Sequence, residues 1–312
     1  MSDGRTLLVL GARGFLGAHL CTAAEEAGFR VVRASREGAE GAVAADLLDP
    51  ASLRDAIDRT APDAVANAAG FASVAASWED PERSRAINAR GAENLLGAVA
   101  AAAPGAHVLC LSSAQVYGEP LPERMPFRED QELDPVSPYG RAKAEMEGAC
   151  AAFAARHGLR IAVARPFNLV GPGQSPDHAV SGFARQAALA EVEDRAAVEL
   201  DVGNMDAARD FVDVRDAAAA LAEVARRGLT GIHTLCSGRA VELREVIAMI
   251  GDLTGRPVRV RSVPELAWPA DPQVSYGMPD RLHRAIGWSP LTPLRESVGD
   301  LIDWWRLGGA LR

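Results

Sequence analysis

Short apolar runs alternate with longer segments of helical character along the first half of the chain. The runs cover residues 6–10, 30–34, 42–44, 64–70 and 106–111. Apolar runs of this length without polar alternation are typical of strands buried on both faces. Strands that alternate with helices at regular spacing predict an α/β fold with a doubly wound parallel sheet.

A glycine-rich turn follows the first apolar run. Gly11, Gly14 and Gly17 stand three residues apart, and a helix-forming segment begins directly after them. A strand, a glycine turn and a helix in this order are typical of a Rossmann-type dinucleotide site, because the helix N-terminus presents unpaired N–H groups to the phosphates. An ordinary strand-to-helix turn is the alternative interpretation. The residues expected to contact a cofactor here are Gly11, Arg13, Gly14, Phe15, Leu16 and Gly17.

The end of the second strand bears on the choice of cofactor. Enzymes that prefer NAD(H) usually place a carboxylate there to accept hydrogen bonds from the ribose hydroxyls. This chain has Ser35 and Arg36 instead, and a guanidinium suits a 2′-phosphate. NADP(H) is therefore favoured. NAD(H) is the alternative if Arg36 is only a solvated surface side chain.

Two further segments are expected to line the cofactor. Asp46 and Leu47 end the third strand, where the carboxylate can contact the adenine amino group. The alternative is that Asp46 caps the helix expected from about Pro50. Small residues at the end of the run 64–70, Ala69 among them, let a cofactor lie against the backbone.

Composition and charge narrow the functional classes. The net charge of −9 disfavours a nucleic-acid partner. No apolar run approaches the roughly 18–20 residues of a membrane span, and the N-terminus lacks the features of a signal peptide, so a soluble cytoplasmic protein is expected. The four cysteines lie far apart without metal-ligand spacing, so no metal centre is expected.

One lysine stands among the 33 basic residues, at position 143. In a chain this rich in arginine, a remaining lysine indicates a role that arginine does not fill. Lys143 follows Tyr139 by four residues in a segment of helical character, so the two side chains share one helix face. With three tyrosines in 312 residues, chance seldom produces this spacing. A surface lysine is the alternative.

Tyr139 and Lys143 together suit proton transfer. A phenol has a pKa of about 10, and a fixed ammonium nearby favours the phenolate and lowers that pKa. The ammonium also has rotatable donors for the nicotinamide ribose, which the planar guanidinium of arginine does not match. Ser113 stands just after the strand expected at 106–111 and can donate to the same substrate oxygen. The alternative for Ser113 is a serine bonded to backbone.

The sequences GARGFLG, NAAG, SSAQVYG and YGRAK occur in this order. Together they resemble the extended short-chain dehydrogenase/reductase family, also described as NAD-dependent epimerases and dehydratases, over essentially the whole chain. The resemblance implies Ser113, Tyr139 and Lys143 as the catalytic set. Ser113 rather than Ser112 takes the role, because the family's catalytic hydroxyl stands three residues before the valine of VYG, here Val116.

The second half of the chain resembles nucleotide-sugar enzymes. The stretch ARPFNLVGPGQ, residues 164–174, implies that Asn168 contacts the substrate and that backbone near Pro166 contacts the nicotinamide. Residues 202–211 resemble the segment GNLD..RDF of GDP-hexose enzymes and imply that Arg209 pairs with the substrate diphosphate. An ion pair of Arg209 with Asp206 or Asp210 is the alternative. The implied substrate-binding residues are Ser113, Gln115, Asn168 and Arg209.

The residues after Ser113 favour one reaction within this family. A dehydratase needs a carboxylate beside the catalytic hydroxyl, and Ala114 and Gln115 provide none. We therefore expect NADPH-dependent reduction of the 4-keto group of a nucleotide-diphospho-4-keto-6-deoxyhexose, with GDP as the expected nucleotide. A nucleotide-sugar epimerase that uses bound NAD, and a catalytically silent dinucleotide sensor, are the alternatives.

One position departs from the family pattern. Trp268 stands where the family usually has an arginine that contacts the nucleotide. The expectation of GDP then requires that Arg281 or Arg284 substitutes, or that the nucleotide sits differently.

The expected organisation has two parts. Residues 1–168, with about 209–236, are expected to form the NADP(H)-binding domain, and residues 169–208 and 237–312 a small substrate lobe. Asp213 is expected to cap a helix, and Trp304 and Trp305 to pack the last helix onto the body. The resemblance implies a homodimer through alanine-rich helices at about 81–103 and 139–157. The alternative is that these helices merely cover the sheet.

Overall fold

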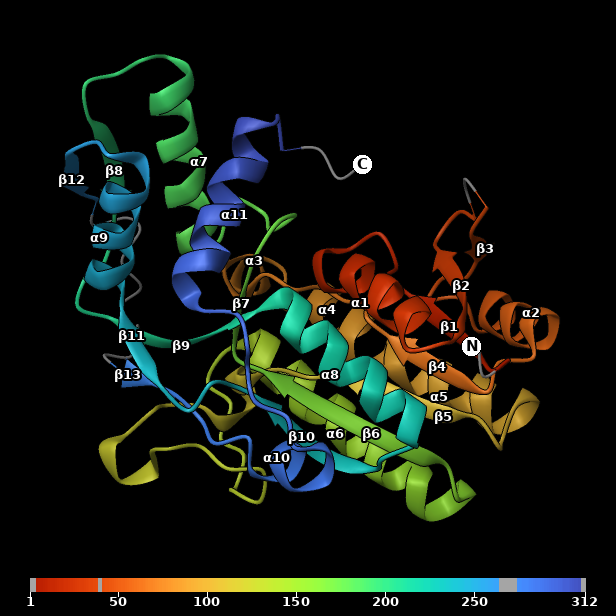
Figure 1. The fold of residues 1–312 in the computed structure, drawn as a ribbon. Helices are drawn as coiled ribbons and strands as arrows, with labels where there is room; N and C mark the ends of the chain where they lie inside the picture. Colours follow the sequence, from red (N-terminus) through yellow and green to blue (C-terminus); the bar gives the residue numbers. More distant parts are fainter. Residues whose placement is uncertain (1–3, 39–40, 264–273, 310–312) are drawn as a thin grey trace.

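The computed structural model describes residues 4–38, 41–263 and 274–309. Its centre is a seven-stranded parallel sheet with the strand order β10-β6-β5-β4-β1-β2-β3 (Figure 1). The strands are β1 (Thr6–Leu10), β2 (Arg30–Ser35), β3 (Val43–Ala44), β4 (Ala64–Asn67), β5 (His107–Leu111), β6 (Arg160–Pro166) and β10 (Gly231–Leu235). Parallel strands put their carboxyl ends at one edge, so β1, β4, β5 and β6 all end beside one another.

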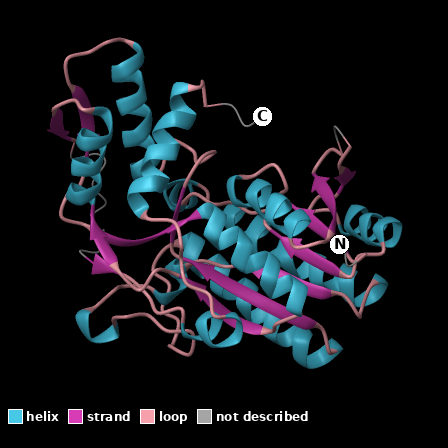
Figure 2. Ribbon diagram, in the orientation of Figure 1, coloured by secondary structure: helices cyan, strands magenta, loops and turns pink. Residues whose placement is uncertain are grey.

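Helices cover both faces of this sheet, as Figure 2 shows. Leu8 and Leu10 of β1 face a core formed with α2 (Pro50–Thr60), α5 (Gly91–Ala102) and α6 (Pro138–His157). Leu7 and Val9 face the opposite core, formed with α1 (Phe15–Glu26) and α8 (Val214–Arg227). This alternation buries every residue of β1, as expected for a strand covered on both sides. The predicted Rossmann-type α/β class is confirmed.

A smaller lobe lies beyond the carboxyl ends of β6 and β10 (Figure 1). It contains the helices α7 (Ala179–Val192), α9 (Leu243–Thr254) and α11 (Leu294–Arg306), which enclose a core of their own. The central strand of its sheet is β9 (Ala208–Asp213). It pairs with β7 (Asn168–Val170), β11 (Ala240–Glu242) and β13 (Val274–Ser275). The strands β8 (Val198–Val202) and β12 (Val258–Ser262) pair separately.

Two segments do not follow the division into two parts that was expected from the sequence. The rest of that division stays a prediction. β9 pairs with strands of the smaller lobe although it opens the segment 209–236. α10 (Asp280–Ile286) packs Leu282 and Ile286 into the core of the large sheet, although it belongs to the segment 237–312. The chain therefore crosses between the two parts more often than the sequence pattern indicates.

The helix expected at 81–103 is divided into parts. α4 (Pro81–Arg85) follows α3 (Val74–Glu79), continues into a π-helical turn (Ala86–Arg90) and then becomes α5. A π turn adds a residue to one helical turn and so shifts which side chains face inward. Here it buries Asn88, the one polar side chain among the inward positions of this turn.

Several local expectations concern the second half of the chain. Asp213 accepts a hydrogen bond from the backbone N–H of Arg215 and caps α8, as expected. Trp304 and Trp305 pack against the core of the smaller lobe, and the Trp305 indole N–H donates to Ser181. All four cysteines are buried and free. No helix among the described ranges is long and apolar enough to cross a bilayer.

Candidate active site

The glycine turn lies where β1 ends, against the chain that leaves β4. Gly11 has a φ of +75°, and a Cβ built there would lie 2.5 Å from the backbone nitrogen of Ala69. A Cβ on Gly17 would lie 2.0 Å from the carbonyl oxygen of Gly11. α1 therefore begins in direct contact with the turn, and Ala69 lies beside it. The turn and the first N–H groups of α1 form a cradle of bare backbone that fits a pyrophosphate.

The other residues predicted to bind a cofactor surround this turn. Arg13 is exposed, and Phe15 and Leu16 are half-buried at the start of α1. Arg36 is exposed directly after β2. These residues and the turn fit an NAD(P) cofactor, whose phosphates and adenosine they would hold.

Asp46 and Leu47 lie in the loop between β3 and α2. The side chain of Asp46 accepts a hydrogen bond from the N–H of Leu48 at 2.9 Å, whereas Asp49 caps α2. Asp46 is thus not the helix cap that was its alternative. Leu47 is buried against Gly91 of α5.

Tyr139 and Lys143 lie on the first turns of α6, directly against the end of β5. The side chain of Ser137 caps the helix by accepting from the N–H of Gly140 at 3.0 Å. A Cβ on Gly140 would lie 2.6 Å from the carbonyl oxygen of Gln115, so a glycine is needed for this close approach. The contact draws Tyr139 to Ser113, and their side chains interact by a hydrogen bond.

Ser113 is oriented by the chain that follows it. Its side chain accepts from the N–H of Gln115 at 3.2 Å and so caps the 3₁₀ helix Ala114–Tyr117. Because that bond uses a lone pair, the hydroxyl hydrogen remains available for donation to another oxygen. Gln115 itself is exposed.

Lys143 is buried, with its ammonium close to both the sheet and the tyrosine. Its Nζ donates to the carbonyl oxygen of Leu111 at 2.7 Å and lies 5.8 Å from the centroid of the Tyr139 ring. Burial lowers the pKa of Lys143 to about 8. The solvated surface lysine that was the alternative is therefore excluded.

The sequence predicts that Lys143 lowers the pKa of Tyr139, but the structure shows a shift in the opposite direction. Burial raises the pKa of Tyr139, and the hydrogen bond with Ser113 offsets part of that rise. Removing a phenol from water penalises the phenolate, and this effect sets the direction of the shift. Tyr139 is thus a protonated acid at neutral pH in this structure.

Asn88 is a site residue that the sequence patterns did not indicate. The π turn directs its side chain to Phe71, whose N–H it accepts from at 3.1 Å and whose carbonyl oxygen it donates to at 3.0 Å. A Cβ on Gly70 would lie 2.8 Å from Asn88 Oδ1 and 3.5 Å from Lys143 Nζ. Asn88 thus holds the loop that faces Lys143. The dipeptide Ile87-Asn88 gives no local signal for a π turn.

Asn168 and Arg209, two of the four residues expected to bind substrate, lie at the start of the smaller lobe. Pro166 ends β6 and Asn168 begins β7, where its side-chain amide donates to the carbonyl oxygen of Asp210 at 3.0 Å. Arg209 lies on β9, the neighbouring strand, and is half-buried, with Nη1 donating to the carbonyl oxygen of Ala208 at 2.9 Å.

The two acidic candidates for pairing with Arg209 have other partners. Asp206 pairs with Arg244. The buried carboxylate of Asp210 accepts hydrogen bonds from the N–H groups of Ser237 and Gly238 at 2.6 Å and 3.0 Å. Burial raises the pKa of Asp210 to about 6.

Arg281 and Arg284, the possible replacements for the family's nucleotide-contacting arginine, lie on α10. Arg281 donates through Nη1 to the carbonyl oxygen of Ile232, near the amino end of β10 and away from the carboxyl ends of the strands. Arg284 is exposed. Trp268 lies outside the described residues.

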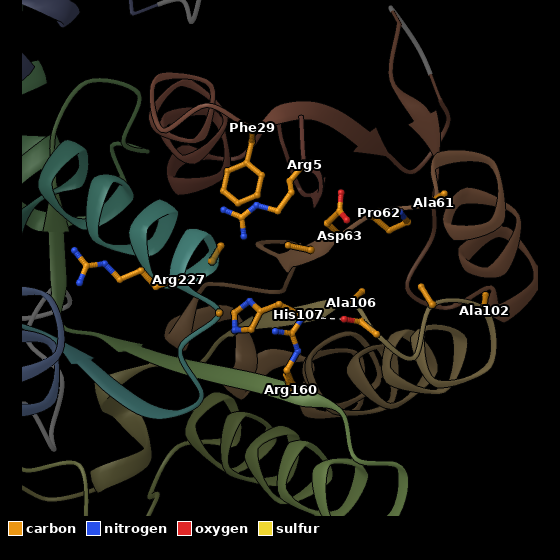
Figure 3. Close-up of a pocket in the computed structure, with 15 residues that line it drawn as sticks. Arg5, Phe29, Ala61, Pro62, Asp63, Ala102, Ala106, His107, Arg160 and Arg227 are labelled. Atoms are coloured by element: carbon orange, nitrogen blue, oxygen red, sulfur yellow. Dashed lines mark hydrogen bonds between the residues drawn. The ribbon is translucent and has the colours of Figure 1, made fainter. Parts of the chain in front are cut away.

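A cavity of about 460 Å³ lies at the opposite edge of the sheet, near the amino ends of β1, β4 and β5 (Figure 3). Arg5 donates to the carbonyl oxygen of Arg226 and Arg160 to that of Gly105. These arginines satisfy carbonyl groups at and near helix C-termini, which is a structural role. A second cavity, of about 370 Å³, lies in the smaller lobe around Arg259 and Arg261. Neither includes Tyr139 or Lys143.

The sequence and the structure are similar to those of known proteins. The model of the NAD dependent epimerase/dehydratase family matches residues 7–235. GDP-6-deoxy-D-mannose reductase of Pseudomonas aeruginosa is 32% identical over 302 residues, which cover 96% of each chain. A structure of RMD from Pseudomonas aeruginosa complexed with NADPH has a TM-score of 0.88, with 31% identity over 97% of this chain and 99% of that one.

An epimerase is also similar. The structure of Thermus thermophilus UDP-glucose 4-epimerase complexed with NAD has a TM-score of 0.84 and 28% identity, over 96% of this chain and 99% of that one. The family resemblance seen in the motifs is confirmed, and so is the expectation of an NAD(P) cofactor. The chain belongs to the NAD dependent epimerase/dehydratase family, as an NAD(P)-dependent oxidoreductase of the extended short-chain dehydrogenase/reductase type.

Proposed function

We propose that the protein reduces the 4-keto group of a nucleotide-diphospho-4-keto-6-deoxyhexose with NADPH. The best candidate reaction is the conversion of GDP-4-keto-6-deoxy-mannose to GDP-rhamnose. The observation that carries the proposal is the meeting of Ser113, Tyr139 and Lys143 at the end of β5, with Ala114 and Gln115 as the next residues. Such a site provides a proton and an oxygen-binding donor but no carboxylate base beside them.

NADPH, when bound, supplies a hydride to the carbonyl carbon. Tyr139 then gives its proton to the carbonyl oxygen, and its raised pKa keeps that proton available at neutral pH. The Ser113 hydroxyl can turn to donate to the same oxygen as negative charge develops there. Lys143 keeps two N–H donors beyond the one held by Leu111, which suit the hydroxyls of a ribose.

The choice of NADPH and of GDP rests on the surrounding residues. Arg36 is an exposed cation where a carboxylate would favour NAD, and the similar RMD structure holds NADPH. Arg209 and Asn168 lie on adjacent strands of the smaller lobe, and guanidinium geometry matches a diphosphate. The similar reductase acts on a GDP sugar, which supports GDP over other nucleotides.

The test is a panel of 4-keto-6-deoxy sugars carried on GDP, dTDP and CDP, each offered with NADPH and with NADH. We expect loss of NADPH absorbance with the GDP sugar, at a rate well above that with NADH. Tyr139→Phe removes the transferred proton, so we expect kcat to fall by about a hundredfold or more while the circular dichroism spectrum stays unchanged.

Three other outcomes overturn the proposal. Turnover without net NADPH consumption and with tightly retained NAD indicates the epimerase. Cofactor binding without turnover of any sugar indicates a dinucleotide sensor. Near wild-type turnover by Tyr139→Phe rejects the assignment of the catalytic set.

A further inference from the structure

A buried ion pair lies one helical turn beyond the catalytic lysine. Glu147 of α6 and Arg165 of β6 are 7% and 4% exposed. Arg165 Nε donates to Glu147 Oε1 at 2.9 Å and Nη2 donates to Oε2 at 2.6 Å. The contact is bidentate, with two parallel charge-assisted hydrogen bonds, and it joins the helix that carries Tyr139 and Lys143 to the strand that ends at Pro166.

The pair also holds the residues on either side of Ser113. Ser112 Oγ donates to Glu147 Oε1 at 2.5 Å. Arg165 Nη1 donates to the hydroxyl oxygen of Tyr117 at 3.0 Å, and its guanidinium lies 4.8 Å from the Tyr117 ring centroid. Ser112 directly precedes the catalytic serine, and Tyr117 ends the 3₁₀ helix that Ser113 caps. The ion pair thus fixes the chain before and after Ser113.

Fold stability alone does not call for such a pair. Removing two charges from water carries a large desolvation cost, and well-packed apolar residues of similar volume are often at least as stabilising. Apolar packing is available beside the pair, since Tyr117, which Arg165 contacts, stacks on Phe127 with ring centroids 4.6 Å apart. A buried pair that joins three segments of the site is better explained by the residues that it holds in position.

The pair also bears on the charge of Lys143. The titratable groups that face its ammonium are Glu147, Cys150 and Tyr139 on α6 and Cys110 on β5. Burial lowers the pKa of Lys143, and Glu147 acts in the opposite direction by favouring the charged form.

We propose that Glu147 and Arg165 are positioning residues for the catalytic set: through Ser112 and Tyr117 they hold Ser113 against Tyr139. The inference rests on the proposed catalytic roles of Ser113, Tyr139 and Lys143. Neither Glu147 nor Arg165 is assigned a contact with substrate or cofactor.

The first experiment replaces one charge. Glu147→Gln keeps the shape of the side chain but loses the bidentate pair and the negative charge. We expect kcat to fall at least tenfold, with a much smaller change in KM, because a small displacement of a catalytic group has a large effect on rate. The alkaline limb of the kcat profile should move to lower pH by roughly one unit, since the ammonium loses a nearby carboxylate.

The chain offers a matched control in Asp213. Its carboxylate is equally buried and also accepts from an arginine and a serine, Arg215 and Ser297. Asp213→Asn removes the same charge from a similar setting that does not adjoin Lys143. It should lower thermal stability without moving the alkaline limb.

The second experiment separates orientation from stability. The double variant Glu147→Leu with Arg165→Met leaves no unpaired buried charge, so it should fold better than Glu147→Gln. We expect it to keep cofactor affinity within a few-fold while kcat stays at least tenfold low. Ser112→Ala, which leaves the ion pair in place, should lower kcat severalfold with a smaller loss of Tm than Glu147→Gln.

Three results test the positioning role of Glu147 and Arg165. If the double variant recovers wild-type kcat and an unshifted pH profile, the pair is structural only and the proposal is wrong. The same holds if Asp213→Asn moves the alkaline limb as far as Glu147→Gln does. If Tyr139→Phe remains active in the same assay, the catalytic assignment fails instead, which distinguishes the two cases.

Discussion

Lys143 shows how burial changes the chemistry of a side chain. Its ammonium is held by Leu111 within the fold, and burial lowers its pKa to about 8. Burial acts on Tyr139 in the opposite sense and keeps the phenol protonated. The direction matters for the proposed reduction, in which the tyrosine gives a proton to the product oxygen and the lysine stays cationic.

A pH profile follows from these two pKa shifts. The lysine carries its charge below its pKa and loses it above, so the rate of reduction should decline as pH rises through about 8. In Lys143→Arg the guanidinium stays protonated, so the remaining activity should show no such decline. We expect kcat of this variant to be about a hundredfold or more below wild type, because arginine does not reproduce the ammonium geometry.

The measurement is kcat against pH for wild type and Lys143→Arg. Arg141→Lys, an exposed position two residues earlier on the same helix, serves as the control and should match wild type. Equal rates for wild type and Lys143→Arg, or the same alkaline decline in both, would contradict the role assigned to Lys143.

At the scale of elements, the site depends on two contacts that tolerate no side chain. The start of α1 touches the turn after β1 through Gly17, and the start of α6 touches the 3₁₀ helix after Ser113 through Gly140. Each contact puts a helix N-terminus directly at the edge of the sheet. The first prepares a phosphate cradle, and the second brings Tyr139 to Ser113.

Gly17→Ala tests the first contact. The added methyl group would meet the Gly11 carbonyl oxygen at 2.0 Å, so the helix must shift. We expect a loss of about 1–3 kcal/mol in unfolding free energy and at least tenfold weaker NADPH binding. Thermal unfolding and fluorescence titration measure the two effects.

Gly299→Ala is the matched substitution within α11. Its methyl group would lie 3.6 Å from Leu253 Cδ2, an ordinary contact. Replacing a helical glycine there should add about 0.5–1 kcal/mol of stability and leave NADPH binding unchanged. Wild-type NADPH affinity in Gly17→Ala would show that the turn does not hold the cofactor.

At the scale of the whole molecule, the outer face of α6 presents small side chains from Gly148 onward. A Cβ on Gly148 would meet nothing within 4 Å, and Ala152 and Ala155 are exposed. Such a face permits close approach of another helix, which agrees with the homodimer expected from the sequence. That assembly stays a prediction.

Gly148→Trp tests it. A large side chain on a closely packed helical interface would hold the two copies apart, so we expect wild type to sediment as a dimer and the variant as a monomer. Leu291→Glu, at a residue 84% exposed and outside α6, should leave the assembly unchanged. A monomeric wild type, or a variant that remains dimeric, would refute the interface.

The sequence by itself determined the features that depend on neighbouring residues. Apolar runs predicted the strands, the glycine spacing predicted the turn before α1, and a spacing of four residues put Tyr139 and Lys143 on one helix face. These signals are local, because strand and helix periodicities repeat within a few residues.

Only the tertiary structure decided features that depend on distant segments. The π turn placed Asn88 against the loop beside Lys143, and packing joined Glu147, Arg165 and Ser112 from three elements. Burial, which no spacing reveals, set the direction in which the pKa of Tyr139 moves. Long-range contact and desolvation arise from the whole fold, so a linear pattern does not contain them.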